Sequence, residues 1–308
     1  MMRPPKIVVV GSINMDLVVR CGTLPLAGQT VAAHSVNEVC GGKGANQAVA
    51  ARKCGAQAQM IGRVGSDAFA DRLMSNLDQQ TVDHTRVWTT SDCSSGLAIV
   101  AVEDSGQNAI TLIAGANGRV SVSDVQQNAN IIESADTLLL QLEIPTPTVL
   151  AAIRIAKTAG VRCIVDPAPV ASDWNDELLG VDLVCPNESE AEVITGVPIE
   201  TLADAQKAAA ILQSRGAKNV AITMGDRGTL LGHGNTFHHF EAACVNAVDT
   251  TAAGDAFAGA LATRWAETDD LTEAVKFANL AGAIAATRHG AQPSLATRQE
   301  IEDLRSTQ

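Results

Sequence analysis

Aromatic side chains are scarce in this chain of 308 residues: phenylalanine and tryptophan make up 3% of it, and tyrosine is absent. A site that holds a flat ligand by stacking it on aromatic rings is therefore disfavoured. Positive charge is also short, because 22 Lys and Arg stand against 34 Asp and Glu, a net charge of −12. This balance argues against nucleic acid or an anionic membrane as the main partner, and it favours small ligands held by local donors.

Long apolar runs and paired cysteines are missing as well. The most apolar late stretch, 277–286, has the composition of a short alanine-rich helix that Gly282 breaks, well below the ~20 residues needed to cross a bilayer. The apolar run at 7–10 is too short for a signal peptide, so we expect a cytoplasmic protein. No C-x-x-C pair occurs, which disfavours zinc and redox motifs and predicts free thiols at positions 21, 40, 54, 93, 163, 185 and 244.

Apolar residues, at 46%, suffice for a sizeable core, and the chain is long enough for one large α/β domain or two small ones. Short apolar runs typical of buried parallel strands alternate with helical patterns, which predicts a βα-alternating architecture. The expected strands cover residues 6–10, 59–64, 137–142, 161–166, 183–186 and 220–223. The expected helices cover residues 45–53, 68–79, 146–159, 203–215, 256–265 and 271–286.

Two stretches, 16–40 and 96–114, interrupt this alternation with strand-like runs. The second contains a polar turn at 103–108, as expected between two antiparallel strands. Together they predict a small separate β-sheet that could serve as a lid. In open parallel sheets ligands bind beyond the carboxyl ends of the strands, so the residues that follow the apolar runs are the candidates for function.

The string Asp-Thr-Thr-Ala-Ala-Gly-Asp at 249–255 places a carboxylate at the start of an alanine-rich helix. The first turn of a helix has unpaired N–H groups and the positive end of the helix dipole, which together bind anions. The small residues Ala252, Ala253 and Gly254 let a phosphate approach these amides, and Asp255 lies within reach of a hydroxyl. The string predicts phosphoryl transfer to an alcohol with Asp255 as general base. Taken alone, it also fits an N-cap and a close-packed turn.

Two polar motifs follow the first strand and open the first helix. Residues 11–16, Gly-Ser-Ile-Asn-Met-Asp, place Asn14 and Asp16 where they could bind neighbouring sugar hydroxyls. Residues 41–46, Gly-Gly-Lys-Gly-Ala-Asn, would let a ligand contact the main chain, with Asn46 as a further polar contact. Neither motif is a G-x-G-x-x-G fingerprint or a Walker A loop, which disfavours a Rossmann dehydrogenase and P-loop binding of ATP. Each alone also fits an ordinary turn.

Further candidates follow later strands. Glu143 ends an apolar run at the carboxyl edge of the sheet, where a solvated strand end is equally plausible. Asn187 and Glu190 form either a helix capping box or a site at which Glu190 accepts a hydrogen bond from magnesium-bound water. Residues 223–228 form either a hairpin turn or a surface for nucleotide contacts. A surface hairpin, rather than a metal site, is predicted around three closely spaced histidines: His233, His238 and His239.

Four of these motifs together resemble, in the same order, those of the ribokinase family of sugar kinases; they lie at 11–16, 41–47, 187–190 and 249–255. The resemblance covers nearly the whole chain. It implies a three-layer α/β/α fold with a central, mostly parallel sheet, in one domain over 1–308 with lid strands inserted at about 14–40 and 94–114. It further implies ATP-dependent phosphorylation of D-ribose at the 5-hydroxyl, and a homodimer that pairs through the lid.

The resemblance also assigns roles to individual residues. It implies that the ribose is held by Asn14, Asp16, Gly42, Lys43, Gly44, Asn46, Glu143 and Asp255. It implies ATP contacts at Asn187, Thr223, Gly225, Gly228, Gly254 and Asn279. Asp255 would be the base, and the anion hole for the transferred phosphoryl group would be the backbone of Ala252, Ala253, Gly254 and Asp255, in agreement with the helix-end argument.

Two cations are implied in addition to ATP. Mg²⁺ would be organised by Glu190 through water. An activating monovalent cation, K⁺, would bind beside the anion hole, in several cases through backbone carbonyls, at Asp249, Thr251, Ala285, Arg288, Gly290 and Ser294. Alanine at 252 and 253 replaces the Gly-Ala pair of many relatives, and it still leaves the amides accessible.

Rival interpretations are a kinase of the same family acting on 2-deoxyribose, another sugar or a nucleoside, and a non-catalytic sugar-binding protein that kept the fold. Asn14 and Asp16 favour a sugar with vicinal hydroxyls, and the scarcity of aromatics disfavours a nucleoside. Gly254 and Asp255 are both present, which disfavours the non-catalytic alternative.

Overall fold

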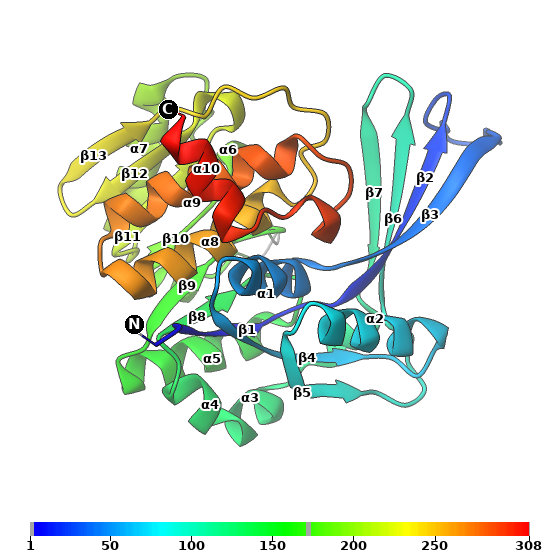
Figure 1. The fold of residues 1–308 in the computed structure, drawn as a ribbon, viewed down its shortest axis with the longest axis horizontal. Helices are drawn as coiled ribbons and strands as arrows, with labels where there is room; N and C mark the ends of the chain where they lie inside the picture. The colour runs from blue at the N-terminus through cyan, green and yellow to red at the C-terminus, as the bar shows by residue number, and fades with distance from the viewer. Residues whose placement is uncertain (1–2, 171–173, 308) are drawn as a thin grey trace.

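A large sheet with helices on both faces forms the main body of the protein (Figure 1). The computed structural model describes residues 3–170 and 174–307, and within them the large sheet has nine strands in the order β13-β12-β11-β10-β9-β8-β1-β4-β5. All neighbours are parallel except β11–β12 and β12–β13, which are antiparallel. Its strands are β1 (Lys6–Val10), β4 (Gln57–Val64), β5 (Asp83–Thr89), β8 (Thr137–Leu140), β9 (Arg162–Val165), β10 (Leu183–Val184), β11 (Asn219–Thr223), β12 (Thr229–His233) and β13 (Thr236–Phe240).

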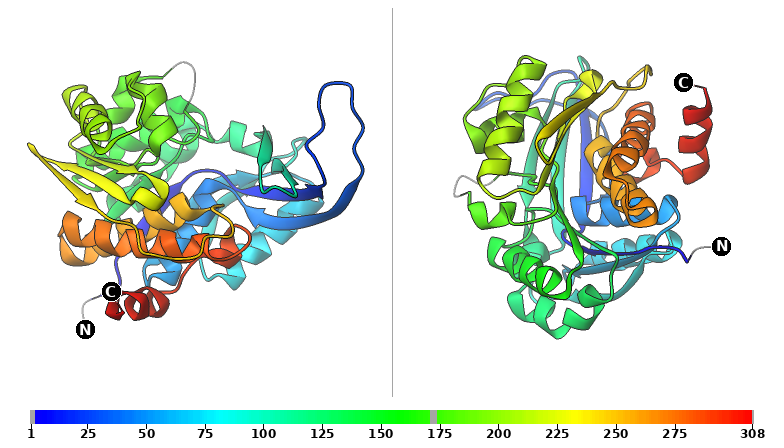
Figure 2. Two further views of the ribbon diagram at one scale, coloured as in Figure 1. Left: turned by 90° about the horizontal axis from the view of Figure 1, so that it is seen from above. Right: turned by 90° about the vertical axis from the view of Figure 1, so that its left-hand side faces the viewer.

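The apolar strands alternate their side chains between two cores, which produces three layers. Ile7 and Val9 of β1 pack on one face, whereas Val8 and Val10 pack on the other. The first core is covered by α1 (Lys43–Lys53), α2 (Ala68–Gln79), α8 (Ala253–Thr268), α9 (Leu271–Ala286) and α10 (Arg298–Ser306). The second core is covered by α3 (Val122–Gln127), α4 (Ala129–Glu133), α5 (Thr146–Ala159), α6 (Glu188–Thr195) and α7 (Leu202–Ser214), as the right-hand view of Figure 2 shows.

A second, four-stranded sheet projects away from the main body (Figure 1). It has the order β3-β2-β6-β7, and we call it the small sheet; its strands are β2 (Asn14–Cys21), β3 (Ala33–Gly41), β6 (Gly96–Glu103) and β7 (Asn108–Ile113). The two stretches that interrupt the βα alternation therefore do form a separate sheet, with the expected turn between β6 and β7. Asn14 and Gly41 are paired where this sheet joins the main body, so the small sheet grows directly out of the candidate site.

The sequence analysis located most elements of the main body. Helices α2, α5 and α9 and strand β1 have the expected bounds, and the hairpin expected around the three histidines is β12–β13. The expected break at Gly282 is wrong, because α9 is continuous through it. A Cβ at this position would lie 3.2 Å from the carbonyl oxygen of Ala253, so this glycine lets α9 approach the start of α8 rather than ending the helix.

Helices α1 and α8 approach each other very closely at Gly259 of α8. A Cβ atom there would lie 2.5 Å from Cβ of Ala50, 2.7 Å from the carbonyl oxygen of Gln47 and 2.8 Å from the nitrogen of Ala51. No side chain fits in that space. The absence of one at Gly259 is therefore what lets the amino end of α1 reach the amino end of α8.

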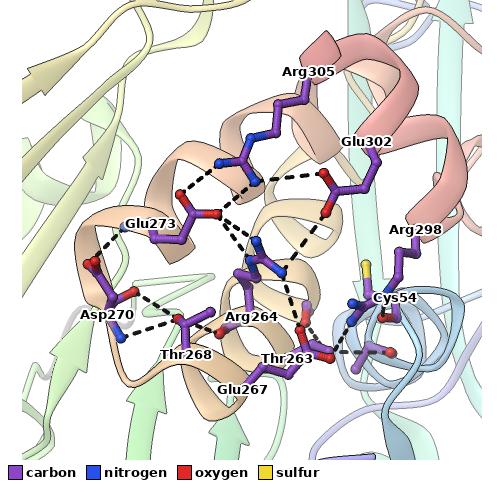
Figure 3. A network of polar contacts seen from close by, with 12 residues as sticks. Cys54, Thr263, Arg264, Glu267, Thr268, Asp270, Glu273, Arg298, Glu302 and Arg305 are labelled. Atoms are coloured by element: carbon purple, nitrogen blue, oxygen red, sulfur yellow. Dashed lines mark hydrogen bonds and ion pairs between the residues drawn. The ribbon is translucent and has the colours of Figure 1, made fainter. Parts of the chain in front are cut away.

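An ion-pair network joins three helices on the same face of the sheet (Figure 3). Arg264 of α8, about one-fifth exposed, donates to Glu273 of α9 at 2.7 Å, and Arg305 of α10 contacts the same carboxylate at 2.8 Å. Arg298 of α10 pairs with Glu267 of α8 and donates to the carbonyl oxygen of Cys54, at the end of α1, at 2.7 Å. Exposed pairs stabilise little one by one, but a half-buried network fixes the order of α1, α8, α9 and α10.

No helix among the described residues has the length and apolarity needed to cross a membrane.

Substitution of Gly259 tests the close approach of the two helices. Gly259→Ala should lower the free energy of unfolding by about 1–3 kcal/mol, because the new methyl group must push α1 away from α8. Urea denaturation measures this change. Gly118→Ala is the matched control, since the only atom near its Cβ position is Cβ of Ala114 at 3.5 Å. Equal stabilities for the two variants would contradict the packing argument.

Candidate active site

The amino ends of α1 and α8 meet beyond the carboxyl ends of β1, β8 and β9. This is the edge of a parallel sheet at which ligands bind. Three of the sequence motifs converge here: residues 11–16, residues 41–46 and residues 249–255. The contact that joins them is a hydrogen bond of 2.9 Å from Nδ2 of Asn46 to Oδ2 of Asp255.

Asp255 is the third residue of α8 and is only 4% exposed. Its second oxygen, Oδ1, accepts a hydrogen bond of 3.2 Å from Nε2 of Gln47. Two amide side chains from α1 therefore orient this carboxylate. The Oδ1 atom of Asn46 is buried and has no partner within the described residues, so an acceptor next to Asp255 is available for a ligand hydroxyl.

The turn before α8 presents backbone amides beside this carboxylate. Ala252 adopts the left-handed conformation, with φ of 60°, and Ala253 donates its N–H to the carbonyl oxygen of Thr250 at 3.2 Å. The amides of Gly254 and Asp255 donate to no backbone carbonyl of the described residues. A Cβ at Gly254 would meet nothing within 4 Å, so the approach to these two amides is open.

Glu143 is the centre of a polar cluster that also contains Ser12, Asn14 and Lys43. Its Oε2 atom accepts from Oγ of Ser12 at 2.5 Å, from Nδ2 of Asn14 at 3.3 Å and from the backbone nitrogen of Lys43 at 3.4 Å. Asn14 is held from its other end by Asn117, whose Nδ2 donates to Oδ1 of Asn14 at 2.6 Å. The predicted contacts Asn14 and Glu143 are thus direct neighbours.

Gly42 and Gly44 let the start of α1 lie against the chain that follows β1. Gly42 has φ of 91°, and a Cβ there would lie 2.6 Å from the nitrogen of Asn14. A Cβ on Gly44 would lie 2.6 Å from the nitrogen of Ser12. The two glycines therefore bring the backbones of both motifs together.

Charges of opposite sign are concentrated in this site. Burial, together with the neighbouring carboxylates of Glu143 and Asp255, raises the pKa of Asp16 to about 7. Burial opposes the charged form of Lys43. Four neighbouring carboxylates, of which Asp166 and Asp255 act most strongly, nevertheless raise its pKa above the ordinary value. Lys43 is thus the central cation of an acidic site.

A cavity of about 680 Å³ lies on the other side of Gly254. It is lined by the turn after β11, by residues of the segment 242–250, by the first turns of α8 and by the second half of α9. Five of the residues predicted to contact ATP line it: Thr223, Gly225, Gly228, Gly254 and Asn279.

Local contacts shape the walls of this cavity. Asn279 accepts a hydrogen bond of 2.6 Å from Oγ1 of Thr229, which fixes its side chain against β12. Gly228 has φ of 82°, and a Cβ there would lie 2.0 Å from the carbonyl oxygen of Phe240. The turn at 223–228 is thus both the connection of two antiparallel strands and a wall of the cavity.

Asn187 and Glu190 form a capping box at the start of α6. Oδ1 of Asn187 accepts from the nitrogen of Glu190 at 2.9 Å, and Oε2 of Glu190 accepts from the nitrogen of Asn187 at 2.8 Å. Asn187 pairs with Thr223, a residue of the cavity wall. Burial raises the pKa of Glu190. The charges of Lys43 and Asp255 both act on this carboxylate, so Glu190 interacts electrostatically with the rest of the site.

The segments predicted to bind a monovalent cation also lie next to one another. Asp249 accepts from the nitrogen of Thr251 and from the nitrogen of Gly290, both at 2.9 Å, so the start of α8 is tied to the segment after α9. The carbonyl of Ala285 already accepts from the nitrogen of Arg288 at 3.2 Å.

Two of the predicted cation-site side chains have other partners. The guanidinium of Arg288 pairs with Glu300 at 2.5 Å, and Oγ of Ser294 donates to the carbonyl of Ala291 at 2.7 Å. Within residues 3–170 and 174–307, no group of three His, Cys, Asp or Glu side chains is arranged to hold a metal ion.

Several polar residues of the site were not found in the sequence analysis. Asp166 directly follows β9 and is 6% exposed; burial raises its pKa to about 8, against the effect of Lys43. The same inspection of strand ends that selected Glu143 could have selected Asp166 and Gln141. Ser12 and Gln47 lie inside motifs already quoted, but their spacing carries no separate signal.

Comparison with known proteins agrees with this geometry. Residues 4–298 match the model of the pfkB family of carbohydrate kinases. The chain is 40% identical to a ribokinase of Haemophilus influenzae, over 95% of each chain. It is 36% identical to a deoxyribokinase of Salmonella typhi, over 96% of this chain and 97% of that one.

A solved structure, ribokinase of Arabidopsis thaliana complexed with ribose and ATP, is similar over nearly the full length. It matches with a TM-score of 0.90 and 32% identity, covering 98% of this chain and 99% of that one. The fold, the order of the motifs and the full-length matches all lead to one conclusion. The chain belongs to the pfkB family of carbohydrate kinases.

Proposed function

We propose that this protein transfers a phosphoryl group from ATP to the 5-hydroxyl of D-ribose and so forms D-ribose 5-phosphate. One observation carries the proposal. The buried carboxylate of Asp255 lies between a cluster of sugar-type ligands around Glu143 and a cavity of about 680 Å³ lined by Gly254. The relatives named ribokinase, and the one solved with ribose and ATP, support the choice of substrates.

Asp255 accepts the proton of the attacking hydroxyl in this proposal. Asn46 and Gln47 each donate to one of its oxygens, which leaves the second lone pair of each oxygen for the substrate. The free amides of Gly254 and Asp255 receive the charge of the phosphoryl group in transfer, with the positive end of the α8 dipole behind them.

In this proposal the sugar is bound by polar groups that are already fixed by their neighbours. Asn14, Asp16 and Glu143 offer one donor and several acceptors, and Lys43 adds a cation. Asn117 and Ser12 hold Asn14 and Glu143 in place, so little side-chain entropy is lost when a sugar binds. Gly42 and Gly44 provide backbone contact on the remaining side.

Mg²⁺ is the cation that we propose for the nucleotide, and the carboxylate of Glu190 fits it through water. One oxygen of Glu190 caps α6, and the other accepts no hydrogen bond within the described residues. A hard, hydrated cation suits such an oxygen, and it would neutralise charge on the phosphates of ATP. Asn187, Thr223, Gly225, Gly228 and Asn279 would hold the rest of the nucleotide.

A monovalent cation, K⁺, is proposed beside the anion hole, where Asp249 ties the start of α8 to Gly290. Although burial acts in the other direction, hydrogen bonds from Thr251 and Gly290 keep the pKa of Asp249 below its ordinary value. The carboxylate is therefore charged at neutral pH, as a cation site requires. Backbone carbonyls of the neighbouring segments would complete the coordination.

The small sheet is proposed as a lid of a single domain, and as the contact between two copies of the chain. Its exposed apolar side chains support this role: Val36 is 61% exposed, Ile110 57% and Leu112 46%. Asp16 lies on the same sheet, so closure of this sheet over the sugar would bring Asp16 toward the sugar. Lid closure would exclude water and so prevent hydrolysis of ATP.

A cytoplasmic location remains part of the proposal.

A substrate panel tests the proposed function most directly. With ATP, Mg²⁺ and K⁺, the protein should form ADP with D-ribose, and kcat/KM for 2-deoxyribose or a nucleoside should be at least about tenfold lower. A coupled assay of ADP formation measures this. A preference for 2-deoxyribose would transfer the assignment to the second candidate, which the Salmonella relative supports. Binding of ribose without ADP formation would show a non-catalytic protein.

Removal of the base should separate turnover from binding. Asp255→Asn should reduce kcat by about 10²- to 10⁴-fold, because proton acceptance is lost. The dissociation constant for ribose, measured by calorimetry, should change far less. Asp303→Asn, on the exposed face of α10, is the control. Near-normal turnover in Asp255→Asn would overturn the assignment of the base.

Sugar affinity should depend on pH through Asp16. Its raised pKa of about 7 means that the carboxylate is charged above that pH and protonated below it, and the protonated form has fewer acceptors for sugar hydroxyls. KM for ribose should therefore rise as the pH falls through about 7, by up to about tenfold at one unit below. Asp16→Asn should have a high KM that no longer follows pH. A KM for the wild type that stays constant from pH 6 to pH 8 would contradict this.

A further inference from the structure

Gln47 joins two buried carboxylates with a single amide group. Its side chain is fully buried on α1, and Nε2 donates to Oδ2 of Asp166 at 2.8 Å and to Oδ1 of Asp255 at 3.2 Å. An amide nitrogen has two hydrogens, so both bonds can exist at once. Asp255 approaches from α8 and Asp166 from the end of β9. The amide thus lies between the two layers of the site.

The orientation of this amide is fixed by a fourth residue. Nε2 of Gln141, which follows β8, donates to Oε1 of Gln47 at 2.5 Å. A flipped Gln47 would direct its oxygen at two carboxylates and its nitrogen at another donor, so only one orientation is compatible with its neighbours. Gln141 is itself confined, because its Oε1 atom occupies the place that a Cβ on Gly11 would take.

Charged groups face this bridge from several elements. Lys43 of α1 is the cation that acts on this bridge among the described residues, while Asp16 of β2, Glu143 after β8 and Glu190 of α6 add negative charge to Asp166 and Asp255. The charge of Asp255 disfavours ionisation of Asp166 in this poorly solvated place. Gln47 supplies a donor to both and adds no charge.

We infer that Gln47 is a positioning residue for phosphoryl transfer: it holds the carboxylate of Asp255 toward the attacking hydroxyl by anchoring it to Asp166, with its own orientation set by Gln141. This inference rests on the proposed function. Asn46 fixes only Oδ2 of Asp255, and one hydrogen bond leaves a carboxylate free to rotate about it. The second bond, from Gln47 to Oδ1, defines the plane of the carboxylate and hence the direction of its lone pairs.

Substitution by methionine removes both donors and keeps a side chain of similar length. Gln47→Met should lower kcat by about 10- to 100-fold, because the base is misplaced relative to the hydroxyl. KM and the dissociation constant for ribose should change by less than about threefold, because most of the groups proposed to hold the sugar, among them Asn14, Asp16 and Glu143, are not hydrogen-bonded to Gln47. Gln141→Met, which touches neither carboxylate, should shift kcat in the same direction by a smaller factor.

The charge-sensitive variant is Gln47→Glu. Its new carboxyl has one proton to donate only when protonated, so its activity relative to that of Gln47→Met should rise as the pH falls from 8.5 to 6. A ratio that stays constant over this pH range would contradict the need for a hydrogen-bond donor at this position. Asp16 titrates in both variants, and the wild type measured over the same pH range provides the reference.

Gln213→Met is the matched control. Gln213 lies on α7, in the opposite helical layer, and its side chain donates to the carbonyl of Gly234 at 3.0 Å. Its kinetics should equal those of the wild type. A wild-type kcat in Gln47→Met would overturn the inference. So would a loss of kcat/KM in this variant that comes entirely from a higher KM. If Gln47→Met does not fold, as judged by its melting temperature, Gln141→Met decides: an unchanged kcat there overturns the inference. A wild type that phosphorylates no sugar would instead refute the proposed function itself.

Discussion

The separation between α1 and α8 determines the geometry of the whole site. These helices belong to different parts of the chain, yet the missing side chain at Gly259 lets their backbones approach almost to contact. Asn46 and Gln47 reach Asp255 only because of this approach. A sheet of parallel strands supplies the other half of the site, since Glu143 and Asp166 follow neighbouring strands β8 and β9. Packing between two helices thus aligns Asp255, the proposed base, with acidic groups from the sheet.

Electrostatics then determine what this geometry can bind. Five carboxylates, those of Asp16, Glu143, Asp166, Glu190 and Asp255, act on one another or on Lys43 in a poorly solvated region. Such a site disfavours a free anion, but it suits an anion that arrives with cations. The acidic cluster and the open amides of α8 are therefore complementary: one part favours the metal ions and the other the phosphate.

Much of this arrangement could be predicted from the sequence, because the strong signals are local. Helix α2 has an apolar stripe and an Asp67 cap, and α5 ends at Gly160, so their bounds follow from periodicity and turn chemistry. Asp255 was identifiable because a helix start and a carboxylate coincide. Strand β5 was missed because only Val87 among its residues is buried, so it has no apolar run. Gln47 and Asp166 were missed because the partners of Gln47 are 94, 119 and 208 residues away, and no local pattern encodes such pairings.

The junction between the small sheet and the main body has a mechanical consequence. Asn14 and Asp16 are part of β2, which is hydrogen-bonded along its length to β3 and β6, and Gly41 at the end of β3 leads without a linker into α1. A ladder of this kind is stiff, so the small sheet cannot swing without carrying Asn14 and Asp16 with it. Among the described residues, only Gly42 separates β3 from α1, so we expect the sheet and these side chains to move together. If the small sheet is the proposed lid, contact with the sugar and exclusion of solvent would be one and the same displacement.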